Sequence, residues 1–239
     1  MINYYKHQLC LNCLCKDIKN AEAILKVMDG NVLIGLLSAD YESVDAALSD
    51  MESYQKTLKG HISVGLGGGN PKQWKMAADI AARLQPDHVN QIFSAVGYTR
   101  AKCENSYINA LVSPSGIPGL VKISTGPLSR NEEPALIPAA TAVAMIKEMG
   151  GNSLKFYPMG GLKCKAELIE AAKACAEAEF ILEPTGGITT DNLEEILAII
   201  LNAGVKKIIP HVYTSIMDEK GSTKLAEIEK IAEIFKRLI

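Results

Sequence analysis

A lysine lies in the middle of the short apolar stretch Ser153-Leu-Lys-Phe-Tyr-Pro-Met-Gly-Gly161. The stretch has the composition of a buried strand, which Pro158 and the two glycines end. If Lys155 points into a core, desolvation lowers its pKa by favouring the neutral amine. A neutral amine near pH 7 can attack a ketone and form a Schiff base. The alternative is a lysine that extends to the strand end and pairs with a carboxylate.

A second pattern, Leu182-Glu-Pro-Thr-Gly-Gly-Ile188, joins the next predicted strand to a helix that begins at Asp191. The turn of Thr185, Gly186 and Gly187 can offer a hydroxyl and backbone N–H groups to a phosphate. An ordinary tight turn is the alternative, but a position one strand–helix unit after Lys155 favours an anion site. Gly67-Gly-Gly-Asn-Pro71 could bind a carboxylate or phosphate in the same way, or form a plain turn.

Apolar strands alternate with amphipathic helices along the chain, which predicts a single α/β domain over residues 1–239 with the architecture of a (β/α)₈ TIM barrel. An extra N-terminal helix, Asp17–Met28, precedes the first predicted strand, and a doubly wound open sheet is the alternative architecture. The predicted strands are Val32–Ser38, Ile62–Leu66, Val89–Phe93, Ile108–Val112, Leu120–Ser124, Leu154–Tyr157, Phe180–Glu183 and Lys207–Tyr213. The predicted helices are Ser43–Leu58, Lys72–Leu84, Gly97–Cys103, Ala135–Met149, Ala166–Ala176, Asp191–Asn202 and Lys224–Leu238.

Catalytic residues of such barrels lie at the C-terminal ends of the strands, and Lys155 falls on the sixth predicted strand. Glu183 has the same parity as Thr185, so both face the same way one strand away from Lys155. A carboxylate there could transfer protons if its pKa is raised toward neutrality. Alternatively, Glu183 forms an ion pair with Lys155 or Lys122. Tyr157 and His211 are further acid–base candidates, although His211 could be a hydrogen-bonded core histidine.

Composition excludes several classes of function. A net charge of −2 gives no electrostatic basis for binding nucleic acid or an acidic membrane. No apolar run approaches the roughly 20 residues that span a bilayer, and no signal peptide is evident, so we expect a cytoplasmic protein. The cysteines at 10, 13 and 15 lack a second pair of ligands, so we expect no metal. The glycines of residues 67–69 do not form a dinucleotide fingerprint, so we expect no nucleotide cofactor.

Two of these stretches, Leu154-Lys-Phe-Tyr-Pro158 and Pro184-Thr-Gly-Gly-Ile188, resemble the 2-keto-3-deoxy-6-phosphogluconate aldolases. In that family a K-F-F-P strand supplies the Schiff-base lysine and a P-T-G-G-I turn binds the substrate phosphate. The chain is closer still to the divergent branch associated with bacterial glucosaminate breakdown, and this resemblance spans essentially its whole length. The stretches similar to that branch are Val64–Gly67, His88–Gln91, Leu111–Pro114, Val121–Pro127 and Ile208–His211.

The resemblance implies a cofactor-free class I aldolase that splits 2-keto-3-deoxy-6-phosphogluconate into pyruvate and glyceraldehyde 3-phosphate. Lys155 would be its nucleophile, and Thr185, Gly186 and Gly187 would bind the phosphate. The resemblance also favours a homo-oligomer. Another 2-keto acid such as 4-hydroxy-2-oxoglutarate is an alternative substrate, and a non-catalytic sugar-phosphate-binding barrel is an alternative function.

Two features depart from the better-known aldolases. Those enzymes carry a glutamate and an arginine on their second strand, and Ile62-Ser-Val-Gly-Leu-Gly67 has neither. Val121-Lys-Ile-Ser-Thr-Gly126 is similar to the strand that carries the Schiff-base lysine of deoxyribose-phosphate aldolases. Lys122 is therefore a rival nucleophile, a second cation that lowers the pKa of Lys155, or a contact for the substrate carboxylate or phosphate.

Overall fold

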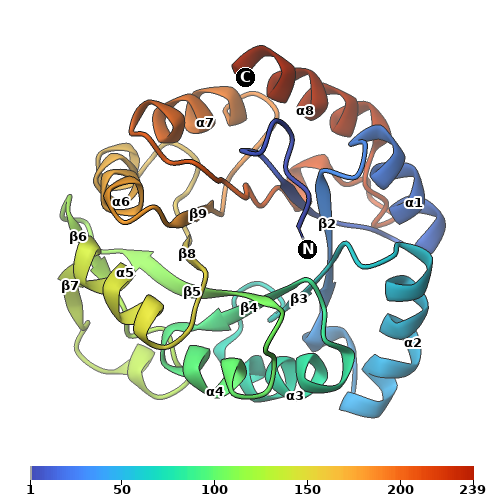
Figure 1. Cartoon of the computed structure of the whole chain (residues 1–239), viewed down its shortest axis with the longest axis horizontal. Coiled ribbons are helices and arrows are strands. Elements are labelled where there is room, and N and C mark those ends of the chain that lie inside the picture. The colour runs from blue at the N-terminus through green and yellow to red at the C-terminus, as the bar shows by residue number, and fades with distance from the viewer. Residues whose placement is uncertain (1) are drawn as a thin grey trace.

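The computed structural model describes residues 2–239, in which seven parallel strands form the wall of a barrel (Figure 1). Each strand is hydrogen-bonded to the next in the order β1-β2-β3-β4-β5-β8-β9. Their bounds are β1 Leu11–Leu14, β2 Val32–Leu37, β3 Ile62–Gly65, β4 His88–Ile92, β5 Tyr107–Pro114, β8 Ser153–Phe156 and β9 Ile181–Pro184.

The predicted strand Lys207–Tyr213 closes the barrel by isolated bridges instead of a continuous ladder. Ile208 bridges Leu9 and Leu182, while His211 bridges Asn12 and Thr185. Pro210 interrupts the ladder on the β1 side, because proline has no N–H to donate. The segment thus occupies the eighth position between β9 and β1, and the (β/α)₈ prediction is confirmed.

Helices form a ring around this wall (Figure 1). Their bounds are α1 Ile18–Val27, α2 Val44–Thr57, α3 Trp74–Leu84, α4 Val96–Arg100, α5 Ala139–Glu148, α6 Lys165–Glu177, α7 Leu193–Asn202 and α8 Leu225–Leu238. The last helix, α8, buries Ile228, Ile231, Ile234 and Phe235 at helical spacing and packs between α7 and α1. The main hydrophobic core therefore lies between strands and helices. No helix of residues 2–239 is long and apolar enough to cross a membrane.

The helix near the N-terminus is not an extra element, contrary to the prediction. Strand β1 precedes α1 and pairs with β2 in parallel register, so α1 is the first regular helix of the barrel. The sequence pattern concealed β1, because the strand has four residues and one of them, Asn12, is polar. That asparagine is fully buried, so a polar residue here marks the barrel interior and not a loop.

The prediction that Leu120–Ser124 is a strand of the barrel wall was also wrong. Strands β6 (Leu120–Lys122) and β7 (Leu136–Pro138) form an antiparallel hairpin beside the end of β5. The short connection after β5 turns the chain back at Gly116 and Gly119, both with positive φ, whereas a parallel neighbour needs a long crossover. The missed β1 and this miscount offset each other, so Lys155 does lie on the sixth strand of the barrel.

Candidate active site

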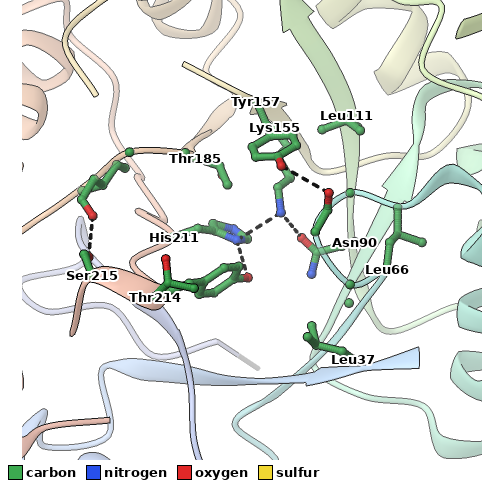
Figure 2. A pocket seen from close by; sticks show the side chains of 18 of the residues that line it. Leu37, Leu66, Asn90, Leu111, Lys155, Tyr157, Thr185, His211, Thr214 and Ser215 are labelled. Carbon is green, nitrogen blue, oxygen red and sulfur yellow. Dashed lines mark hydrogen bonds between the residues drawn. The ribbon is translucent and has the colours of Figure 1, made fainter. Parts of the chain in front are cut away.

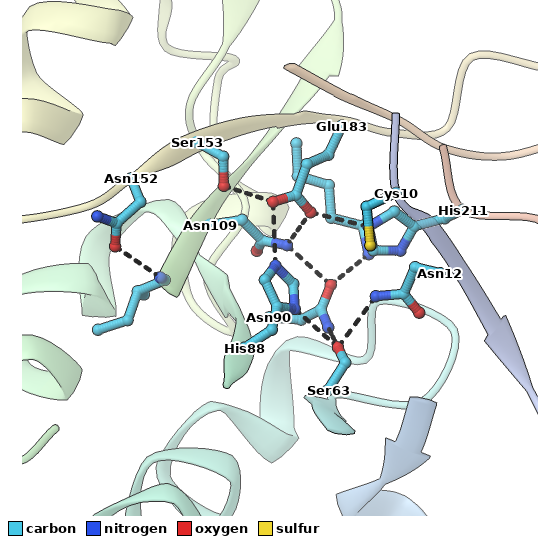
Figure 3. Close-up of polar contacts among 12 residues, drawn as sticks. Cys10, Asn12, Ser63, His88, Asn90, Asn109, Asn152, Ser153, Glu183 and His211 are labelled. Atoms are coloured by element: carbon cyan, nitrogen blue, oxygen red, sulfur yellow. Dashed lines mark hydrogen bonds and ion pairs between the residues drawn. The ribbon is translucent and has the colours of Figure 1, made fainter. Parts of the chain in front are cut away.

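The centre of the barrel interior is a hydrogen-bond network (Figure 3), which lies beside a small apolar cluster of Ile2, Cys10, Leu33, Ile181 and Ile209. Side chains that fill such barrels are typically branched and apolar. Here the inward positions of the strands carry polar groups with at most 4% exposure: Asn12, Ser63, His88, Asn90, Asn109, Ser153, Glu183 and His211. His88 and Asn90 are two residues apart on β4, as are Ser153 and Lys155 on β8, and this spacing directs side chains to the same face of a strand. The barrel centre is therefore built for polar chemistry.

Glu183 on β9 is the centre of this network. Its Oε1 accepts hydrogen bonds from His88 Nε2 at 3.0 Å and from the Ser153 hydroxyl. Its Oε2 accepts from Asn109 Nδ2 at 2.6 Å and from His211 Nε2 at 2.8 Å. The four donors come from four different segments, so the carboxylate connects β4, β5, β8 and the segment that closes the barrel.

The environment of Glu183 keeps it ionised. Burial by itself would raise its pKa, but the electrostatic interaction with the His88 ring and the hydrogen bonds that His211 and His88 donate lower the pKa well below its ordinary value. A pKa raised toward neutrality, which proton transfer by Glu183 would need, is the opposite of what the structure shows. The amine of Lys155 does not contact Glu183 directly, since its hydrogen-bond partners are Asn90 and His211.

His211 connects Glu183 to Lys155. A carboxylate only accepts hydrogen bonds, so Nε2 of His211 carries the ring hydrogen. Its Nδ1 therefore carries a lone pair and accepts hydrogen bonds. Nδ1 lies 3.2 Å from Lys155 Nζ and 2.8 Å from the Tyr213 hydroxyl. Burial and the nearby Lys155 charge lower the pKa of His211 to about 3, so the imidazole is neutral.

Lys155 points into the barrel, as its apolar neighbours in the sequence predict. Its side chain is 8% exposed, and Nζ donates to Asn90 Oδ1 at 2.6 Å. Burial lowers the pKa of Lys155 to about 8, although the charge of Glu183 works in the opposite direction. A substantial fraction of this amine is therefore neutral near pH 7.5 and can act as a nucleophile.

A cavity of about 330 Å³ lies over the C-terminal ends of the strands, and Lys155 and His211 are part of its lining (Figure 2). The glycine loop of residues 67–69 and the turn of residues 185–187 also line it. Tyr157 contacts both, because its hydroxyl donates to Gly68 O at 3.2 Å and its ring lies against Gly186. The cavity therefore brings together Lys155 and the Thr-Gly-Gly turn that follows it in the sequence.

The turn is packed tightly against the segment that follows Lys155. Gly186 and Gly187 have φ values of +99° and +72°, and a Cβ on Gly187 would lie 2.5 Å from Gly161 N. Backbone hydrogen bonds run from Met159 N to Thr185 O and from Gly161 N to Gly186 O. Only glycine suits these two positions, and the turn is held in a constant position relative to Lys155.

Neither Lys122 nor any cysteine of the described residues lines this cavity. Lys122 is on β6, in the hairpin outside the parallel barrel wall, and does not line the cavity. Cys10 and Cys13 are buried, and burial raises the pKa of both thiols. Within residues 2–239, no group of three or more His, Cys, Asp and Glu side chains could hold a metal ion.

Sequence reasoning did not identify the amides and the second histidine of the network. His88 and Asn90 lie two residues apart on β4, and Asn109 is a single amide within the buried part of β5. A polar residue at every second position of an otherwise buried strand was the available signal, because period-two spacing places these groups on one face.

Comparison with known proteins identifies relatives over the whole chain. A family model described as KDGP aldolase matches residues 5–220. A 2-dehydro-3-deoxy-phosphogluconate aldolase of Salmonella typhimurium is 42% identical over 245 residues, covering 100% of this chain and 99% of that protein.

Solved structures with the same fold are far more distant in sequence. TrpF from Jonesia denitrificans superposes with a TM-score of 0.58 at 12% identity, covering 96% of this chain and 98% of that chain. An N-(5'-phosphoribosyl)anthranilate isomerase from Pyrococcus furiosus gives 0.55 at 12% identity, covering 97% and 100%. At such identities the likeness concerns the barrel fold alone.

The lowered pKa of Lys155 predicts how its reactivity depends on pH. Only the neutral amine attacks an anhydride, so the acetylation rate of Lys155 should rise with pH and level off above about 8. The control is Lys236, whose pKa the hydrogen bond to Glu233 raises, so its rate should still climb at pH 10. Peptide mass spectrometry measures both rates in one sample. A Lys155 rate that climbs in parallel with that of Lys236 would contradict the prediction.

Proposed function

The chain belongs to the KDGP aldolase family, and from this premise we propose that it is a class I aldolase whose Schiff-base lysine is Lys155. The proposed reaction splits 2-keto-3-deoxy-6-phosphogluconate into pyruvate and glyceraldehyde 3-phosphate. One observation carries the proposal: a lysine amine with a pKa of about 8 lies in the lining of a cavity that also includes the Thr-Gly-Gly turn.

In the proposed mechanism, Lys155 Nζ adds to the C2 ketone and water is lost, which gives an iminium ion. A base removes the proton of the C4 hydroxyl as the C3–C4 bond breaks, the C4 carbonyl forms, and the C3–C4 electron pair moves through C2 to the iminium nitrogen. The aldehyde product leaves, the enamine takes a proton at C3, and water releases pyruvate. The iminium is an electron sink that a free ketone cannot match, which is the reason for covalent catalysis here.

We assign the phosphate to the turn of Thr185, Gly186 and Gly187. Of the described residues that line the cavity, Lys155 is the sole lysine or arginine, whereas Thr185, Thr189, Thr214 and Ser215 contribute hydroxyl groups. Hydroxyls and backbone N–H groups are therefore the donors available to the phosphate, consistent with anion binding after the seventh and eighth strands of a barrel. Holding the phosphate there sets the distance to the reacting carbons.

The nucleophile is tested by trapping the imine. Incubation with pyruvate and borohydride should add one stable adduct to the protein, and mass spectrometry should place it on Lys155. Lys155→Met should lose the adduct because it has no amine, and Lys122→Met should keep it because Lys122 lies outside the cavity. An adduct on Lys122 instead, or no adduct on the parent protein, would overturn the assignment.

The phosphate site is tested with Thr185→Val, which removes a hydroxyl at nearly constant volume. A hydrogen bond to a charged group contributes about 1.5–3 kcal/mol, so KM for the phosphorylated keto acid should rise about 10–100-fold. The unphosphorylated 2-keto-3-deoxy acid is the matched control, and its KM should change little. Equal effects on both substrates, or faster turnover of 4-hydroxy-2-oxoglutarate by the parent protein, would argue against a phosphorylated substrate.

We also propose that the chain forms a homo-oligomer in the cytoplasm through its hairpin surface, defined as Ile117, Leu128 and Leu136 near β6 and β7. These side chains are 50%, 82% and 37% exposed, which is unusual for large apolar residues in one region. Sedimentation should give a species heavier than the 25.7 kDa monomer, and Leu128→Glu should reduce its mass. A parent protein that sediments as a monomer at micromolar concentration would refute this surface.

A further inference from the structure

The proposed reaction needs a group that takes and returns protons, and few cavity residues can do so. Among the described residues that line the cavity, the titratable side chains are Lys155, Tyr157, His211 and Tyr213. Lys155 is committed to the imine, and the Tyr157 hydroxyl donates to the backbone at Gly68. Glu183 is fully buried and does not line the cavity. His211 and Tyr213 are the remaining pair, and the two are in contact.

His211 presents one free lone pair, and it faces the reacting atoms. Glu183 holds the ring hydrogen on Nε2, so only Nδ1 can accept a proton. In the free enzyme, Nδ1 is 3.2 Å from Lys155 Nζ, the atom that becomes bonded to C2 of the substrate. Because C3 and C4 follow C2 directly, the C4 hydroxyl is only a few bonds from Lys155 Nζ in the imine. It is therefore within reach of His211 Nδ1. Formation of the iminium leaves Nζ a single N–H, which the closer acceptor Asn90 Oδ1 at 2.6 Å takes, so Nδ1 is open to the substrate.

Tyr213 allows His211 to change protonation state without losing a hydrogen bond. Its hydroxyl is 2.8 Å from His211 Nδ1 and 3.2 Å from Asn12 Oδ1, so two acceptors compete for one hydrogen. When Nδ1 is unprotonated, the hydroxyl donates to it. When Nδ1 gains a proton, Nδ1–H donates to the tyrosine oxygen and the hydroxyl donates to Asn12 instead. Asn12 is held for this purpose by its own hydrogen bond to Ser63.

We propose that His211 Nδ1, assisted by the Tyr213 hydroxyl, is the acid–base group of the cleavage step, and that Glu183 is a positioning residue. The inference rests on the proposed Schiff-base function. As the C3–C4 electron pair moves to the iminium nitrogen, the C4 hydroxyl proton passes to Nδ1 and the C4 carbonyl forms. The same electron shift cancels the positive charge at Lys155, which together with burial lowers the pKa of His211, so Nδ1 becomes more basic as it takes the proton. After the aldehyde leaves, Nδ1–H returns that proton to C3 of the enamine. No other reactant is needed, and the Glu183 carboxylate stabilises the imidazolium while it exists.

Solvent deuterium exchange into the methyl group of pyruvate measures the protonation of the enamine directly. Nuclear magnetic resonance in D₂O follows this exchange, and borohydride trapping in parallel measures imine formation. His211→Asn should slow the exchange about 10²–10⁴-fold while the imine on Lys155 is still trapped at saturating pyruvate. Exchange within tenfold of the parent rate would overturn the proposal. Loss of both exchange and trapping in a folded variant would also overturn it, because His211 would then act before the imine.

His61→Asn is the matched control, since His61 is partly buried at the start of β3 and hydrogen-bonds only within the wall of the barrel. It should retain both exchange and trapping. If thermal melting shows that His211→Asn does not fold, Tyr213→Phe tests the proposal instead. Its exchange rate should fall at least tenfold while the imine is still trapped. An unchanged exchange rate would refute the proposal. Failure of the parent protein to be trapped at Lys155 would instead refute the proposed function itself.

Discussion

The buried carboxylate of Glu183 is the constraint on which the rest of the site depends. A negative charge at the centre of a barrel is strongly destabilising unless donors surround it. Here four donors from four segments complete both oxygens. Three of these donors are in turn held by a neighbour: His88 Nδ1 by Ser63, Asn109 Oδ1 by the backbone N–H of Gln91, and His211 Nδ1 by Tyr213. The charge thereby fixes the orientation of two histidines. Removing any one donor would leave part of a buried charge unsatisfied.

The charge of Glu183 also influences the pKa of Lys155. Burial favours the neutral amine and lowers its pKa, while the attraction of Glu183 raises it, and the two effects together leave the pKa at about 8. With less burial the amine would stay protonated, and with a closer carboxylate it would form an ordinary ion pair. His211 lies between Lys155 and Glu183, so the amine experiences the charge without contacting it.

This polar centre is compatible with a stable fold because stability comes from another layer. The main hydrophobic core lies between the strands and the surrounding helices, where residues such as Ile34, Ile80 and Phe235 are fully or nearly fully buried. The inward face of the strands is therefore free to carry amides, histidines and a lysine. The outward face of the sheet thus supplies most of the apolar burial, and the inward face carries the hydrogen-bond network beside a small second apolar cluster.

The sequence by itself determined the alternation of strands and helices, the inward lysine and the glycine turn one unit later, because these depend on local periodicity and composition. It missed β1, which is short and contains a polar residue, and it placed β6 in the barrel wall, since a short extended segment looks the same whether it joins a barrel or a hairpin. Only the tertiary structure decided the protonation state of Glu183, because its donor His88 is 95 residues away in the sequence. Which groups meet on that carboxylate, and hence which nitrogen of His211 is free, depends on the register of strands that pair only when the barrel closes.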